Sequence, residues 1–447
     1  MTDFCSFLKK DRDKREIVSL ISALPSNYVG SKRRMLLHIW DMLETENVKF
    51  ETAFDAFSGS GMVSLLFKMM GKTVICNDLL TSSSITAICL LENQTLPLSS
   101  EELSFLCSNI PEESGTFVND NYEGKFFTAK ECEFLDRYKA NVAQLCGGKF
   151  YCGLELLSKA TLASIPNSNF SVYGKDLKAL RSTHEIGKSF WKEKWRDTTR
   201  KRRDANNEIK FPESLEEMYA KYKGAFSLFA IENHVNQHCF LGGRYYNGQT
   251  VAKIEHRINH PKNNGKEITD IPVSIDKVRK VLQEGKAAVF NSDIIELMES
   301  KMIDADLIYL DPPYGGSSSD YAVLYRFLEE YLYEDKLENL EHIQKGSKRF
   351  SKSKGYQEQF EHLLSLCDCF ENWLISYNES SYADLETIKE TIRKAGRPNL
   401  VVKSIPMTYQ YRKNKNVVDL EHFKESYYEE GYKFSERGTE YLILARK

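Results

Sequence analysis

Residues 49–78 read KFETAFDAFSGSGMVSLLFKMMGKTVICND, and this stretch decides the fold. Its first part, KFETAFDAF, is rich in β-branched and aromatic residues, which is typical of a strand, and it stops at the turn residues SGSG. Next, MVSLLFKMMG has apolar residues at helical spacing and a terminal glycine, and TVICND is a short apolar strand that ends in polar residues. A strand, a helix and a strand in this order predict a βαβ unit, and hence a parallel sheet with helices on its faces.

The same alternation returns after about residue 272. Further strands are predicted at AAVFNSD, DLIYLDPPY, WLISYNES, LVVKSI and YLILARK. Residues 97–271 differ, because they are rich in Glu, Lys, Tyr and Asn and include charged helical stretches such as FPESLEEMYAKYKGAFSLFA. We therefore predict an α/β domain built from residues 1–96 and 272–447, interrupted by an inserted, mainly helical domain at residues 97–271.

The composition is that of a globular protein, with 41% hydrophobic and 28% charged residues. No apolar run approaches the roughly 20 residues that a membrane span needs, and the N-terminus lacks the pattern of a secretory signal. We therefore expect a cytoplasmic protein with no membrane association. The ten cysteines include no CxxC pair, which disfavours a zinc site and predicts reduced thiols.

The strongest candidate for chemistry is Asp311-Pro312-Pro313-Tyr314, which directly follows the predicted buried strand at residues 307–310. In an open parallel sheet, ligands bind beyond the carboxyl ends of the strands. The prolines hold the backbone rigid, so Asp311 and a neighbouring carbonyl present two acceptors that suit the two N–H donors of an amino group. Tyr314 offers a flat face on which a base can stack. The alternative is a simple turn, because Asp and Pro are common turn residues.

The second candidate is the glycine turn FDAFSGSG at residues 54–61. It has the GxG pattern without the third glycine of the dinucleotide fingerprint, so alone it indicates only a turn between strand and helix. Asp78 ends the next strand, where nucleoside-binding βαβ units place the acid that binds ribose hydroxyls. Asp78 could instead cap the helix that starts near Thr81. Together the turn and the acid favour a cofactor that contains adenosine.

With these motifs, the chain resembles the Dam-like family of DNA adenine-N6 methyltransferases, in the class alpha order that places a cofactor-contacting segment at the N-terminus. That segment is NYVGSK at residues 27–32, similar to the family's aromatic-x-Gly-Gly-Lys stretch, with Ser31 where Gly is more usual. The likeness covers about the first hundred residues and those after about Val273. It implies a Rossmann-like methyltransferase sheet, mostly parallel with an antiparallel closing strand, which uses S-adenosylmethionine and no metal.

The resemblance also implies the roles of individual residues. The implied catalytic residues are Asp311, Pro312 and Tyr314. The implied cofactor-binding residues are Tyr28, Gly30, Lys32, Asp55, Phe57, Gly59, Gly61, Asp78, Asp293 and Asp311. Asp55 and Ala56 depart from the Glu and Pro that are frequent in the family. Asp78 falls on the family's ribose-binding acid, and Asp293 on its acid near the cofactor adenine.

The implied reaction is methyl transfer to N6 of an adenine in double-stranded DNA. Asp311 and the Pro312 carbonyl would accept hydrogen bonds from N6 and draw its lone pair out of the ring, while Tyr314 stacks on the flipped-out base. A cognate restriction endonuclease is a candidate partner.

Contact with DNA would require a local basic patch, because the net charge of the chain is −3. Three basic stretches lie at residues 188–203, 345–354 and 412–415. A single charge run is usually a solvated face. Residues 188–203, KSFWKEKWRDTTRKRR, are our candidate for phosphate contact.

Two other functions stay open. Enzymes that methylate exocyclic amines of rRNA bases also carry DPPY-type loops, although the N-terminal cofactor segment and the large insertion argue against an RNA substrate. A cytosine-N4 enzyme is disfavoured because such enzymes usually have Ser in place of Asp311. A non-catalytic DNA-binding protein with the same fold is disfavoured by the intact motif residues, which are Gly59, Gly61, Asp78, Asp311 and Tyr314.

Overall fold

The computed structural model describes most of the predicted α/β domain and the first helices of the predicted insertion. The described residues are 14–15, 17–18, 21–22, 28, 30–92, 98–106, 108, 114–123, 129–164, 262–263, 266–267, 286–315, 320–351, 355–379, 381–411 and 434–447. The basic stretches 188–203 and 412–415 lie outside these residues.

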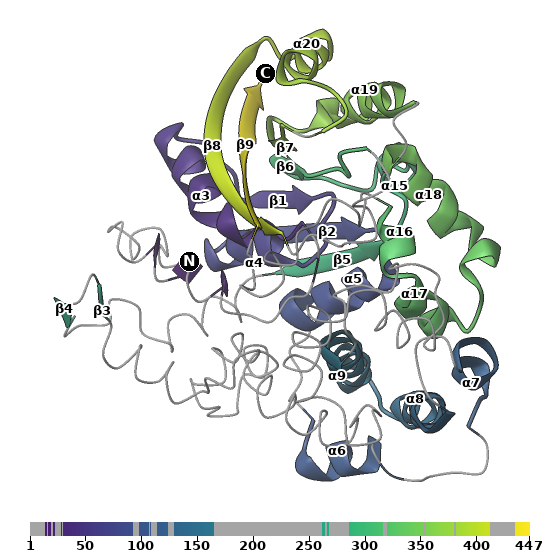
Figure 1. Cartoon of the computed structure of the whole chain (residues 1–447). Coiled ribbons are helices and arrows are strands. Elements are labelled where there is room, and N and C mark those ends of the chain that lie inside the picture. The colour runs from purple at the N-terminus through teal and green to yellow at the C-terminus, as the bar shows by residue number, and fades with distance from the viewer. Residues whose placement is uncertain are drawn as a thin grey trace, which may run out of the picture.

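Within the described residues, seven strands form one sheet (Figure 1). In chain order they are β1 (Thr52–Asp55), β2 (Thr73–Asp78), β5 (Ala287–Asn291), β6 (Leu307–Leu310), β7 (Asn372–Asn378), β8 (Asn399–Tyr411) and β9 (Phe434–Arg446). Their spatial order is β5-β2-β1-β6-β7-β9-β8. The closing strand β9 runs antiparallel to both of its neighbours, and the other neighbouring pairs are parallel. The predicted sheet, mostly parallel with an antiparallel closing strand, is confirmed.

The order of the strands reverses at β1. The chain passes from β1 through α4 (Met62–Met69) to β2 and then outward to β5, whereas β6 returns to the other side of β1 and β7 follows it outward. A crevice forms beyond the carboxyl ends of the strands at such a switch point, and it is the usual ligand site of an open α/β sheet. The segments that follow β1, β2 and β6 therefore meet at one edge of the sheet.

The central strands are buried on both faces, which explains their nearly continuous apolar sequences. In β7, Leu374 joins a hydrophobic cluster with α3 (Leu36–Thr45) and α4, whereas Trp373 and Ile375 join a second cluster with α19 (Tyr356–Leu366). Successive side chains of a strand point to opposite faces, so each face of the sheet is covered by its own layer of helices. The second layer also contains α15 (Ile294–Glu299) and α20 (Leu385–Lys394).

The described part of the predicted insertion is helical. It contains α6 (Ser100–Leu106), α7 (Phe117–Tyr122), α8 (Ala129–Val142) and α9 (Gly148–Ser164), followed by the short strands β3 (Lys262–Asn263) and β4 (Lys266–Glu267). These helices share the first hydrophobic cluster with the sheet, and they gather near α5 (Thr81–Ala87) and α17 (Arg326–Tyr333) in Figure 1. Tyr331 of α17, for example, donates a hydrogen bond to the Leu135 carbonyl of α8, 2.7 Å away.

Several short elements complete the described chain. They are η1 (Lys32–Arg34), η2 (Ile88–Glu92), α16 (Tyr321–Leu324), η5 (Leu337–Asn339), α18 (Glu341–Ser351) and η6 (Cys367–Cys369). Among the residues described, no helix combines the length and apolar character that crossing a bilayer requires.

Truncation of Leu374 tests the two-sided burial of β7. The Leu374 side chain is fully buried, so we expect Leu374→Ala to lower the free energy of unfolding by about 2–5 kcal/mol, because it leaves a cavity in the first cluster. Urea denaturation measures the change. Met302→Ala, at a side chain that is 64% exposed, is the control and should stay within about 0.5 kcal/mol of the original protein. Equal losses in the two variants would contradict this packing.

Candidate active site

A cleft of about 930 Å³, including its opening to solvent, lies at the carboxyl ends of β1, β2 and β6. Almost all of the residues predicted for the site line it. They are Tyr28, Gly30, Lys32, Asp55, Phe57, Gly59, Asp78, Asp293, Asp311, Pro312 and Tyr314. The remaining predicted residue, Gly61, is not among the residues that line the cleft; it has φ +71° and is the N-cap of α4.

Asp311 joins the DPPY loop to the N-terminal segment. Its Oδ1 atom lies 3.0 Å from the Lys32 Nζ and accepts a hydrogen bond of 2.6 Å from the Tyr314 hydroxyl. Burial raises the pKa of Asp311, and the nearby Lys32 charge partly offsets that rise. In the described part of the chain both polar contacts of this carboxylate fall on Oδ1. Its Oδ2 and the Pro312 carbonyl can therefore accept hydrogen bonds from a ligand.

Lys32 is 8% exposed, so it is not a solvated surface lysine. Besides its ion pair with Asp311, its Nζ lies 4.8 Å from the centroid of the Tyr314 ring, within range of a cation–π interaction. The backbone of the DPPY loop is tied to the segment between β7 and α20, because the Tyr314 carbonyl accepts a hydrogen bond of 2.9 Å from the Tyr382 N–H. The loop and the N-terminal segment thus form one rigid corner of the cleft.

Asp78 ties the glycine turn to β2. Its Oδ2 accepts a hydrogen bond of 2.7 Å from the Gly59 N–H, and its Oδ1 accepts one of 2.8 Å from the Leu80 N–H. The first N–H groups of α5 are capped by Glu329 of α17, which accepts from Thr81 at 2.8 Å. Asp78 therefore lies in the cleft wall and is not the cap of α5. Burial raises its pKa to about 6.

Asp55 is a second buried acid, at the end of β1. Its Oδ2 accepts a hydrogen bond of 2.6 Å from the Ser64 hydroxyl, while Oδ1 is buried without a hydrogen bond of normal geometry from the described residues. Burial raises its pKa to about 7, and the neighbouring Asp311 charge adds to the rise. The buried carboxylates of Asp55 and Asp78, with the partly buried Asp311, favour a ligand that carries positive charge in this cleft.

Tyr28 lies in an aromatic stack that the sequence did not reveal. Its ring is parallel to Tyr321 at 5.4 Å and to Tyr325 at 5.2 Å, measured between ring centroids. Position 30 favours glycine, because its φ is +83° and a Cβ there would lie 2.8 Å from the Tyr321 hydroxyl. The only hint in the sequence was the spacing of four between Tyr321 and Tyr325, which places both on one side of a helix.

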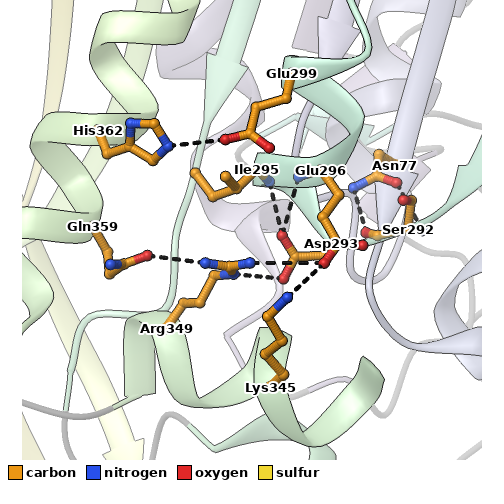
Figure 2. A network of polar contacts seen from close by, with 10 residues as sticks. All are labelled: Asn77, Ser292, Asp293, Ile295, Glu296, Glu299, Lys345, Arg349, Gln359 and His362. Carbon is orange, nitrogen blue, oxygen red and sulfur yellow. Dashed lines mark hydrogen bonds and ion pairs between the residues drawn. The ribbon is translucent and has the colours of Figure 1, made fainter. Parts of the chain in front are cut away.

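Asp293 is held by its own helix and by α18 (Figure 2). Its Oδ1 caps α15 by accepting from the Ile295 N–H at 2.9 Å and the Glu296 N–H at 3.3 Å, and its Oδ2 accepts from the Arg349 Nε at 2.8 Å. Lys345 lies 3.0 Å from Glu296. These two cations of the basic stretch 345–354 are therefore paired with acidic residues of α15.

Helix α18 also forms part of the cleft wall, which sequence reasoning missed. Gly346, Ser347 and Phe350 line the cleft, and the Phe350 ring packs edge-on against Phe57 at 5.6 Å between centroids. Its basic residues had suggested a surface helix, and no local pattern indicated that its opposite side faces the cleft.

The strand order and the acidic, aromatic cleft at its switch point define a Rossmann-like methyltransferase. The sequence model of the D12 class N6 adenine-specific DNA methyltransferases matches residues 28–391, and the chain belongs to this family. It is also similar to the type II methyltransferase M2.HphI of Haemophilus parahaemolyticus, with 26% identity over 391 residues, which cover 87% of this chain and 93% of that protein. The predicted activity, N6 methylation of adenine in DNA, is confirmed.

Substitution of Gly59 tests the contact between the glycine turn and Tyr28. A Cβ at position 59 would lie 2.8 Å from Tyr28 Cε1, and the backbone φ is +49°. We expect Gly59→Ala to displace Tyr28 and to weaken binding of S-adenosylhomocysteine by about tenfold or more in calorimetry. Gly147→Ala is the matched control, because its φ is +57° but its Cβ would meet no atom within 4 Å of the described structure. The free energy of unfolding should fall by about 1 kcal/mol in both variants. Equal affinity for S-adenosylhomocysteine in the two variants would refute the contact between Gly59 and Tyr28.

Proposed function

We propose that this cleft binds S-adenosylmethionine beside a flipped-out adenine, and that Asp311, Pro312 and Tyr314 hold the adenine for methylation. The observation that carries the proposal is the convergence of Lys32, Asp311 and Tyr314 at one corner of an acid-lined cleft. When bound, the cofactor supplies a methyl group on a positively charged sulfur.

The residues present fit such a cofactor. Asp55 Oδ1 is a buried acceptor in the cleft wall with no hydrogen bond of normal geometry from the described residues, which suits a cationic ligand. Asp78 lies at the end of β2, where it can accept from ribose hydroxyls. Asp293, Phe57 and the N-terminal residues Tyr28 and Lys32 complete the walls. We propose these side chains, with the close backbone of Gly30, Gly59 and Gly61, as the cofactor site.

The adenine amine would be held by the DPPY loop. Its two N–H groups match the Asp311 carboxylate and the Pro312 carbonyl, and hydrogen bonds to both acceptors turn the nitrogen lone pair toward the methyl group. Lys32 holds Asp311 in place through the 3.0 Å ion pair. Tyr314 would stack on the base, which offsets part of the few kcal/mol that flipping costs. Positioning and electrostatics then supply the catalysis.

We propose that the substrate is double-stranded DNA, that residues 97–271 recognise the target, and that residues 1–96 and 272–447 form the catalytic domain. Residues 188–203 stay the candidate for phosphate contact. The similar protein M2.HphI is named a type II methyltransferase, which supports a cognate restriction endonuclease as a partner. Because the substrate is DNA, we also propose a cytoplasmic location.

The raised pKa values of Asp55 and Asp78 predict that cofactor binding depends on pH. Both pKa values, about 7 and about 6, exceed their ordinary range near 4, so the folded free protein holds protons that the unfolded chain releases. Without ligand, these groups destabilise the fold as pH rises from about 4 to about 7. A cation prefers the ionised forms, so affinity for S-adenosylmethionine should rise from about pH 5.5 to about pH 8.

Calorimetry in buffers of different ionisation enthalpy measures the proton release that accompanies this binding. Asp55→Asn should make the affinity for S-adenosylmethionine less dependent on pH, because only the proton of Asp78 can then be released on binding. Affinity that is constant or falls over the same range would argue against a cationic ligand at these acids.

Substitution of Asp311 tests the proposed catalysis. Asp311→Asn should lower methyl transfer from labelled S-adenosylmethionine to unmethylated genomic DNA by about 100-fold or more, because a carboxylate acceptor is lost at the reacting amine. Binding of S-adenosylhomocysteine should weaken much less than methyl transfer, since the other walls of the cofactor site remain. Asp384→Asn, at the exposed N-cap of α20, should behave as the original enzyme, because Asn also caps helices. Full activity of Asp311→Asn, or preferential labelling of rRNA, would overturn the proposal.

A further inference from the structure

Helix α18 lies against the cleft wall at very short range. A Cβ at Gly346 would lie 2.6 Å from Leu79 Cδ1 and 2.8 Å from Asp293 Oδ2, so a larger residue at this position would have to displace these side chains. On its other side, the Ser347 hydroxyl donates a hydrogen bond of 2.6 Å to Asp320 Oδ1, and Asp320 caps α16. Helix α18 is therefore held between α15 and α16. It can fix the position of the side chains that it contacts in the cleft wall.

Helix α18 contacts the carboxylate of Asp293 through Arg349. Two carboxylate oxygens offer about four lone-pair positions. The two N–H groups of α15 and the Arg349 Nε occupy three of them, and Arg349 is bound to Oδ2. Asp293 also lines the cleft and is 7% exposed. One acceptor position on Oδ2 is thus left for a ligand in the cleft, and Arg349 decides its direction.

Arg349 is itself rigidly held. Its side chain is 18% exposed, its Nη1 donates to Gln359 Oε1 at 3.3 Å, and its Nη2 lies 3.8 Å from Glu296 Oε1. These contacts come from two helices, α19 and α15, and Figure 2 shows the guanidinium between them. A planar guanidinium with several bonded nitrogens restricts its partner more than a flexible ammonium does.

We propose that Arg349 is a positioning residue that directs Asp293 Oδ2 toward the exocyclic amine of the cofactor's purine ring, and so selects an amino-purine over an oxo-purine. An amine donates to the free lone pair of Oδ2, whereas an oxo group in its place brings two acceptors together. This inference rests on the proposed cofactor site. It assigns Arg349 to ligand discrimination and not to DNA contact, although it belongs to a basic stretch.

The test compares two nucleoside ligands on the full-length protein. Calorimetry measures the affinity for S-adenosylhomocysteine and for S-inosylhomocysteine, in which an oxo group replaces the purine amine. The original protein should prefer the amine by about tenfold or more, and Arg349→Gln should reduce this preference to about threefold or less. Lys345→Gln is the matched control, because it removes the other cation of the network and leaves the contact between Arg349 and Asp293. Its preference should be unchanged.

The ratio of the two affinities separates a positioning role from a loss of stability. Partial unfolding lowers the apparent affinity for both ligands by the same factor and leaves their ratio unchanged. If Arg349→Gln does not fold, Arg349→Lys serves instead, and its preference for the amine should fall between the roughly tenfold preference of the original protein and no preference. An unchanged preference in the folded Arg349 variant would overturn the inference. If the original protein bound neither ligand, the proposed cofactor site itself would fail.

Discussion

Asp55, Asp78 and Asp311 end or follow three adjacent parallel strands, and the common direction of those strands brings their carboxylates to one edge of the sheet. Burial opposes the ionisation of all three and raises their pKa values. The surrounding structure offsets this cost with the Gly59 N–H and the Lys32 ammonium. The rest of the cleft depends on this balance, because a buried acidic site retains its charge only where donors or cations face it.

The donors and cations come from distant parts of the chain. Lys32 belongs to the N-terminal segment that also carries Tyr28, and Tyr28 stacks on residues that come after the DPPY loop. Arg349 reaches Asp293 from α18. An α/β sheet of this kind supplies the acidic edge, and the helices after β6 enclose it. The family match to residues 28–391 begins at Tyr28 and includes all of these segments.

The local motifs could be recognised from the sequence because each is contiguous. A strand, a glycine turn and a helix in residues 49–78 predicted β1, α4 and β2, and the tetrapeptide at Asp311 predicted a ligand site after β6. The partners of these motifs could not be recognised in the same way. Nothing near Tyr28 indicates that Tyr321 stacks on it, and the basic residues around Arg349 are those of an ordinary solvated helix.

The sequence by itself indicated the strands and their polar ends, since apolar periodicity and short motifs are properties of neighbouring residues, and its resemblance to a methyltransferase family implied the type of reaction. Only the tertiary structure decided which side chains neutralise the buried acids and which helix closes the cleft. Asp293 and Arg349 are 56 residues apart, and their pairing depends on how α15 and α18 pack, with a glycine at position 346 leaving the necessary space. Such contacts arise from the packing of whole elements, which local sequence patterns do not encode.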